Sequence, residues 1–124
     1  AIIGEPTEMK VVNAHKGIIS FETKVTGLEA HSSATDKGVS AIMVASALIQ
    51  KLASLAEEYK NKDTDERFAP PYTTIQVGVI HGGTARNIIP RECSFLWEVR
   101  PLYEEHIHDI RREFEQEVQQ QLRD

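Results

Sequence analysis

Apolar and polar residues alternate along three segments of the chain, and this period of two predicts strands. The first segment is Ile18–Val25, where Ile, Phe, Thr and Val alternate with Ser, Glu and Lys. Tyr72–Ile80 and Glu92–Arg100 repeat the alternation. Because successive side chains of a strand point to opposite faces, each segment has one face for a core and one for water. A further short strand is predicted over Ala1–Thr7, which ends at a Gly/Pro turn.

Two other segments have the spacing of helices. In the first, from Val39 to Lys60, apolar residues fall on two neighbouring stripes, a wider surface than a helix on one sheet normally requires. We therefore expect part of this surface to face a partner subunit. The second helix begins at Glu104, where two acidic residues suit the positive end of the helix dipole. Its apolar stripe consists of Ile107, Ile110, Phe114, Val118 and Leu122.

The order of these elements is strand, helix, strand, strand and helix, which predicts an α+β fold. It is the order of a ferredoxin-like, split βαβ sandwich, with an antiparallel sheet that carries two helices on one face. The final strand of that fold is missing from the order, so we expect an open sheet edge that tends to recruit another chain. Ala1–Ile3 is already apolar and the chain stops at Asp124 within a helical pattern, so we expect a fragment of a longer protein.

Composition narrows the classes of function. The chain has 124 residues, of which 40% are hydrophobic and 27% charged, and this suits one globular domain with a modest core. A formal charge of −5 argues against a nucleic-acid partner, and no apolar run reaches the roughly 20 residues that span a bilayer. The single cysteine, Cys93, excludes an internal disulfide and is expected in the core, so we expect a cytoplasmic protein.

Glycine-containing blocks hold the candidate chemistry. Taken alone, each has an ordinary explanation: Glu5 is a surface carboxylate beside a turn proline, His31 a solvated loop histidine and Asn87 a turn asparagine. A lone carboxylate cannot hold zinc, which takes at least three protein ligands at catalytic sites. We therefore expect the chain by itself to hold no metal ion. The four blocks are Gly4–Thr7, Ala14–Gly17, Gly27–Ser33 and Gly82–Pro90.

In their order and positions, these four blocks resemble the lid, or dimerisation, domain of the dinuclear-zinc metallopeptidase and amidohydrolase family. The resemblance is closest to the acetylornithine deacetylase and succinyl-diaminopimelate desuccinylase branch. It implies a homodimeric enzyme with two zinc ions that removes an acyl group from an N-acyl amino acid. It also implies that residues 1–10 are a linker strand from a catalytic domain, that residues 11–124 are the lid, and that the missing final strand follows Asp124.

The resemblance also implies a role for four residues. Glu5 would bind one zinc ion, but only together with the absent catalytic domain. His31 would reach across the dimer into the partner's active site and donate its imidazole N–H to the oxyanion of the tetrahedral intermediate. Asn87 and Arg100 would bind substrate, the amide as both donor and acceptor and the guanidinium as a fork for a carboxylate. One departure from the family pattern is Thr35, which stands where a proline is frequent.

Several alternatives stay open at this stage. Ala14–Gly17 resembles the acetylornithine deacetylase branch, because the desuccinylase branch tends to carry arginines there, and this favours an N-acetyl substrate. The same lid also occurs in desuccinylases, dipeptidases and aminoacylases. A stand-alone ferredoxin-like module that binds a small molecule, or a dimerisation domain of a non-catalytic relative, would have the same fold. The roles of His15, Lys16, His81 and Arg86 are left unassigned.

Overall fold

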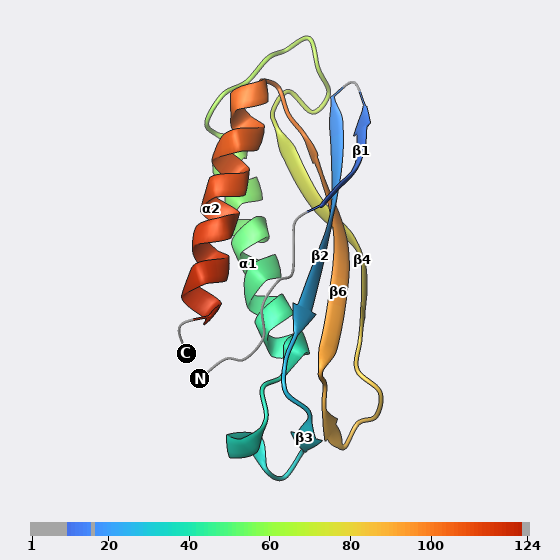
Figure 1. Cartoon of the computed structure of the whole chain (residues 1–124). Coiled ribbons are helices and arrows are strands. Elements are labelled where there is room, and N and C mark those ends of the chain that lie inside the picture. The colour runs from blue at the N-terminus through green and yellow to red at the C-terminus, as the bar shows by residue number, and fades with distance from the viewer. Residues whose placement is uncertain (1–9, 16, 123–124) are drawn as a thin grey trace.

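A computed structural model describes residues 10–15, by their backbone, and residues 17–122. It has two layers, an antiparallel sheet and two helices that lie side by side on one face of it (Figure 1). This confirms the predicted α+β, ferredoxin-like arrangement. The predicted strand Ala1–Thr7, and Glu5 within it, lie outside the described residues.

The main sheet has four strands in the order β1-β2-β6-β4, and each neighbouring pair is antiparallel. The predicted strands appear as β2 (Ile18–Thr26), β4 (Thr74–Gly82) and β6 (Glu92–Arg100). The edge beside β2, where the missing final strand was expected, is partly occupied, because β1 (Lys10–His15) pairs with residues 18–22 of β2. The strand that fills this position therefore comes from the segment before β2.

The two helices also follow the predicted ranges. Helix α1 spans Ala41–Lys60, and the hydroxyl of Ser40 caps it by accepting a hydrogen bond from the Met43 N–H at 3.1 Å. Helix α2 spans Glu104–Leu122. One of the two apolar stripes of α1 is buried throughout, and the other is only partly covered. The buried stripe consists of Ala41, Val44, Leu48, Leu52, Leu55 and Tyr59.

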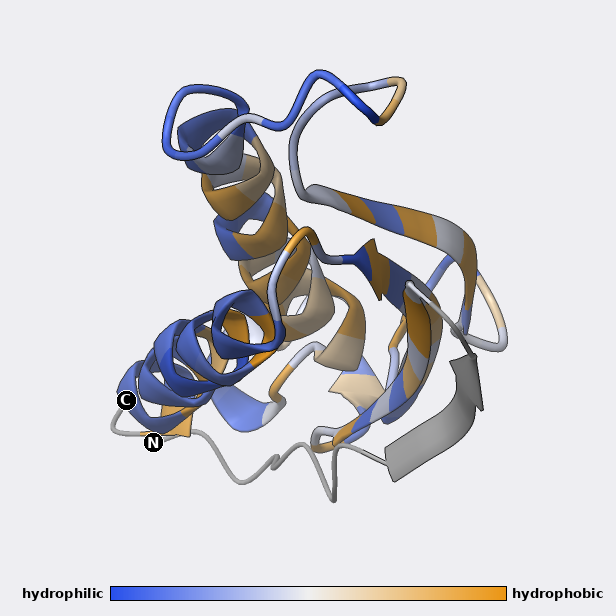
Figure 2. Ribbon diagram, turned by 90° about the horizontal axis from the view of Figure 1, so that it is seen from above, coloured by the Kyte–Doolittle hydropathy of each residue, from blue (hydrophilic) through white to orange (hydrophobic). Residues whose placement is uncertain are grey.

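Apolar side chains of the helices and the sheet form one core between the two layers, and Figure 2 shows hydrophobic residues along the ribbons of both layers. The rings of Phe21 and Trp97 stack with centroids 4.4 Å apart across the β2–β6 pair. The indole N–H of Trp97 donates to the Thr23 hydroxyl at 3.0 Å, which satisfies both buried groups. Cys93 is 3% exposed, which confirms the prediction that it is a core residue.

A small arm extends from one end of the main sheet, at the end where β2 finishes and β6 begins (Figure 1). It contains the two-residue strands β3 (Ala30–His31) and β5 (Ile88–Ile89), which pair antiparallel, and a short 3-10 turn over Thr35–Lys37. This arm holds two of the predicted site residues.

Candidate functional site

The arm brings His31 and Asn87 together from segments that are far apart in the sequence. His31 lies opposite Ile88 in the β3–β5 pair. The next residue, Ser32, donates its backbone N–H to the carbonyl oxygen of Asn87 at 2.9 Å. The segments that carry these two predicted site residues are thus joined by backbone hydrogen bonds, and both residues are exposed to solvent.

Two glycines allow the arm to close on the main sheet. A Cβ atom on Gly27 would overlap the carbonyl oxygen of Val39, and a Cβ on Gly38 would lie 2.9 Å from the Cβ of Ala30. Both contacts are shorter than a side chain tolerates, so the backbone can approach this closely only without one. Leu28 and Val39 use the space to exchange two backbone hydrogen bonds of 2.8 Å. Gly27, which opens the predicted block, and Gly38, which lies outside it, are therefore both needed to position His31.

The imidazole of His31 is fixed through one of its two ring nitrogens. Its Nδ1 lies 2.8 Å from the hydroxyl oxygen of Ser33 and accepts a hydrogen bond from the Ser33 backbone N–H at 3.1 Å. Among the described residues, no hydrogen bond is recorded to the other ring nitrogen, Nε2. His31 is exposed, so Nε2 is accessible to a group from outside this chain.

Arg100 lies far from the other two. It ends β6, whereas the arm lies beside the start of that strand. A nine-residue strand that rises about 3.3 Å per residue separates its ends by about 26 Å. The Arg100 guanidinium donates to the Glu98 carboxylate at 2.9 Å, and its side chain is 59% exposed. Within one chain, Arg100 therefore cannot bind the same small substrate as His31 and Asn87.

The described residues do not provide a metal site. Over residues 10–15 and 17–122, no group of three or more His, Cys, Asp or Glu side chains lies close enough to hold a metal ion. Glu5, the one predicted zinc ligand, is outside this part of the chain. The donor set that the structure shows therefore does not fit zinc, which takes three or more protein ligands.

A buried polar cluster at the other end of the sheet was missed by the sequence analysis. His106 in the first turn of α2 is 2% exposed, and its two ring nitrogens lie 2.5 Å from the Thr73 hydroxyl and 3.0 Å from a carboxylate oxygen of Asp63. The Thr73 oxygen also accepts from the Leu102 N–H at 2.8 Å. His108, two positions further along α2, is exposed, because residues two apart lie on different faces of a helix.

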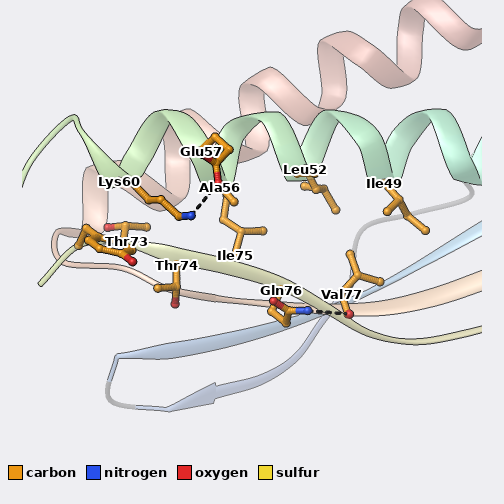
Figure 3. Close-up of a pocket in the computed structure, with 12 residues that line it drawn as sticks. Ile49, Leu52, Ala56, Glu57, Lys60, Thr73, Thr74, Ile75, Gln76 and Val77 are labelled. Carbon is orange, nitrogen blue, oxygen red and sulfur yellow. Dashed lines mark hydrogen bonds and ion pairs between the residues drawn. The ribbon is translucent and has the colours of Figure 1, made fainter. Parts of the chain in front are cut away.

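A pocket lies between α1 and β4, the edge strand of the sheet (Figure 3). Its apolar wall includes Ile49 and Ala56 of α1, and Ile75 and Val77 of β4. Beyond the pocket, β4 contains no charged residue and no proline over its nine residues. Its side chains Val79 and Ile80 are 41% and 49% exposed. An uncharged edge strand next to a half-covered apolar helix face is typical of a protein interface.

Comparison with known protein families matches residues 13–124 to the peptidase dimerisation domain of the M20 peptidase family. The match covers nearly the whole chain. The chain belongs to this family. The predicted lid, or dimerisation, domain is confirmed at the level of the family.

Two curated relatives of this dimerisation domain are both named acetylornithine deacetylase. An acetylornithine deacetylase of Myxococcus xanthus is 48% identical over 82% of the chain, and one of Proteus mirabilis is 40% identical over the same share. The chain spans 27% and 26% of the length of these two proteins. It therefore corresponds to about a quarter of each relative.

Solved structures show the same fold. A tripeptidase of Staphylococcus aureus is 29% identical, with a TM-score of 0.59 over 96% of the dimerisation domain and 27% of the tripeptidase chain. An aminobenzoyl-glutamate utilization protein of Klebsiella pneumoniae is 18% identical, with a TM-score of 0.64 over 96% of the domain and 26% of that chain, and this likeness concerns the fold alone.

In the part of the domain that the structure describes, no helix is long and apolar enough to cross a membrane.

Proposed function

We propose that this chain is the dimerisation and substrate-covering domain of a longer, cytoplasmic, zinc-dependent amidohydrolase that removes the acyl group from an N-acyl amino acid. The acetylornithine deacetylases at 40–48% identity support this activity and an N-acetyl substrate. The observation that carries the proposal is that the β3–β5 pair places His31 and Asn87 on adjoining segments of one exposed arm. Two exposed polar residues on segments joined by backbone hydrogen bonds outside the core suit the binding of a ligand.

The proposed dimer is symmetric and forms through β4 and the partly covered stripe of α1. Pairing of β4 with its own copy would satisfy the exposed edge of the sheet, and the α1 helices would then pack beside each other. The stripe of small and aliphatic residues allows close helix contact, because none of its members is charged. These residues are Ile42, Ile49, Ala53 and Ala56, and the fifth member of the stripe, Ala45, is buried.

Within the active site, His31 would donate from Nε2 to the oxygen of the scissile carbonyl as negative charge develops on it. One such donor typically stabilises a transition state by about 3 kcal/mol. Asn87 offers an uncharged donor and acceptor for the substrate. Arg100 would bind a carboxylate of the substrate through its planar fork, and its side chain is accessible for this.

The separation of Arg100 from the arm shapes the proposed dimer. Because about 26 Å lies between the two ends of β6, His31 and Asn87 of one protomer and Arg100 of the other would serve the same substrate. If His31 acts in the active site of the partner protomer, as predicted, Arg100 at that site must come from the partner protomer. Each active site would then be incomplete without the second protomer.

Zinc would be held by the remainder of the longer protein, with Glu5 proposed as one ligand when that part is present. When bound, two zinc ions supply a nucleophilic hydroxide at neutral pH. The residues of this chain would bind and orient the substrate and stabilise charge on its oxygen. We therefore expect the isolated chain to hold no zinc tightly and to be inactive.

The test is amide hydrolysis by the full-length protein with added zinc, on N-acetylornithine, N-succinyl-diaminopimelate and a tripeptide in parallel. Turnover of N-acetylornithine that a chelator abolishes is expected. Preferential cleavage of the tripeptide would instead move the assignment to a peptidase, which the likeness to the S. aureus tripeptidase makes the second candidate. No turnover of any amide would contradict the proposed hydrolase.

A further inference from the structure

The hydrogen bonds around His31 determine which of its ring nitrogens carries the proton. The backbone N–H of Ser33 donates to Nδ1 at 3.1 Å. A backbone N–H can only donate, so Nδ1 must present its lone pair. In the neutral imidazole the single proton then lies on Nε2. The Ser33 hydroxyl, 2.8 Å from the same nitrogen, must also donate in that arrangement.

The position of Ser33 is itself fixed by the arm. The Ser32 N–H donates to the Asn87 carbonyl at 2.9 Å, and the Ala34 N–H donates to the His31 carbonyl at 2.8 Å. These two bonds enclose Ser33 in a tight turn that begins at His31. The donors to Nδ1 are therefore built into the turn and do not depend on a flexible side chain alone.

We propose that Ser33 is a positioning residue that holds neutral His31 as the Nε2–H tautomer, with that N–H available to a substrate oxygen. This inference rests on the proposed role of His31 in amide hydrolysis. The opposite tautomer would present a lone pair at Nε2, which repels a developing oxyanion. Ser33 would thus act through His31 and would not touch the substrate.

The tautomer is measured directly by nitrogen-15 NMR of the 124-residue chain at alkaline pH, where imidazoles are neutral. The expected spectrum of His31 shows a proton-bearing Nε2 and a lone-pair Nδ1. In Ser33→Ala the Nδ1 signal should move toward that of a solvent-exposed ring, and in Ser32→Ala it should stay unchanged. A proton-bearing Nδ1 in the wild-type chain would overturn the proposal.

Kinetics of the full-length protein separate a positioning role from a structural one. Loss of one hydrogen bond to His31 should lower kcat about fivefold in Ser33→Ala with KM nearly unchanged, and Ser33→Thr, which keeps the hydroxyl, should restore kcat. Equal loss in the Ala and Thr variants would overturn the role of the hydroxyl. If His31→Ala itself left kcat intact while the NMR assignment held, the proposed function would fail and the tautomer assignment would stand.

Discussion

Two histidines at opposite ends of the same sheet show how one side chain serves two purposes. His106 is 2% exposed, and both of its ring nitrogens have partners within the chain. His31 is exposed, and one ring nitrogen is held while no bond to the other is recorded among the described residues. A fully bonded, buried imidazole stabilises the fold, whereas a half-bonded, exposed one is ready for a ligand.

The surroundings of the two rings reinforce the difference. His106 joins three segments: the loop after α1 through Asp63, the entry to β4 through Thr73, and the start of α2. The rings of Tyr59 and Tyr103 pack edge-on against it, with centroids 4.8 and 5.2 Å away. His31 contacts only its own arm through its recorded hydrogen bonds. Removal of the two rings should therefore change different properties of the protein.

The largest effect on stability is expected for His106→Ala. It leaves a cavity among the aromatic rings and removes the partner of the buried Thr73 hydroxyl, so the free energy of unfolding should fall by about 3 kcal/mol. Urea unfolding of the 124-residue chain measures this. His108→Ala, on the exposed face of the same helix, is the matched control and should change stability by less than about 0.5 kcal/mol. Equal effects of the two substitutions on the free energy of unfolding would contradict a structural role of His106.

The converse substitution, His31→Ala, should affect activity and not stability. In the full-length protein we expect kcat to fall about a hundredfold or more, the scale of losing one oxyanion donor. The free energy of unfolding should change by less than about 0.5 kcal/mol, because the ring is exposed. Steady-state kinetics and urea unfolding of one preparation give both numbers. A fall in stability that matches the fall in activity would break the contrast between the two histidines.

The fold could be predicted from the sequence to the extent that it rests on local periodicity. The alternation in β2, β4 and β6 and the stripes of α1 and α2 depend on near neighbours, and their predicted ranges agree with the structure. β1 was missed because its pattern is short. The sequence signal for it was Gly17, because glycine readily takes a positive φ, here 72°, at a tight hairpin turn such as the one between β1 and β2.

The candidate site could be predicted only in part. His31 and Asn87 were selected from their sequence blocks, and the structure adds that their segments adjoin in the arm. The sequence also implied that Arg100 lies far from them, because Arg100 ends the strand that begins shortly after Asn87, but the prediction of a shared site did not take this distance into account. The contacts of His106 with Thr73 and Asp63 join residues 33 and 43 positions apart. Such contacts depend on the tertiary fold, so no local pattern indicates them.

An effect of intermediate size is expected for a substitution in the edge strand β4, which runs from the end of the sheet near His106 to the end near His31. Val79→Lys places a charge on the exposed edge of β4 and should weaken the dimer of the full-length protein at least about tenfold. Sedimentation at several concentrations measures the dissociation constant. Leu96→Lys is the matched control, since Leu96 is similarly exposed but belongs to the inner strand β6. Equal weakening by both variants would contradict β4 pairing.

The smallest expected effect is a dependence of stability on pH that comes from a buried residue of the domain. Burial raises the pKa of the Cys93 thiol above its ordinary value of 9.0. Above that pH the unfolded chain has lost the proton that the folded chain retains, so stability should fall as pH rises toward the pKa of the folded state. Urea unfolding near neutrality and at about pH 10 should show the decline. Cys93→Ala should reduce it, and an unchanged decline would assign it to other groups.

In the proposed dimer, the two ends of one domain serve different active sites. This arrangement is tested most directly by mixing full-length His31→Ala with full-length Arg100→Ala, each of which should be nearly inactive alone. In a mixed dimer, one of the two sites would receive His31 and Arg100 from different, intact sources. With random exchange of protomers, activity should recover to roughly a quarter of wild type. No recovery in dimers shown to have exchanged would mean that both residues serve one site from the same protomer, and the account would be wrong.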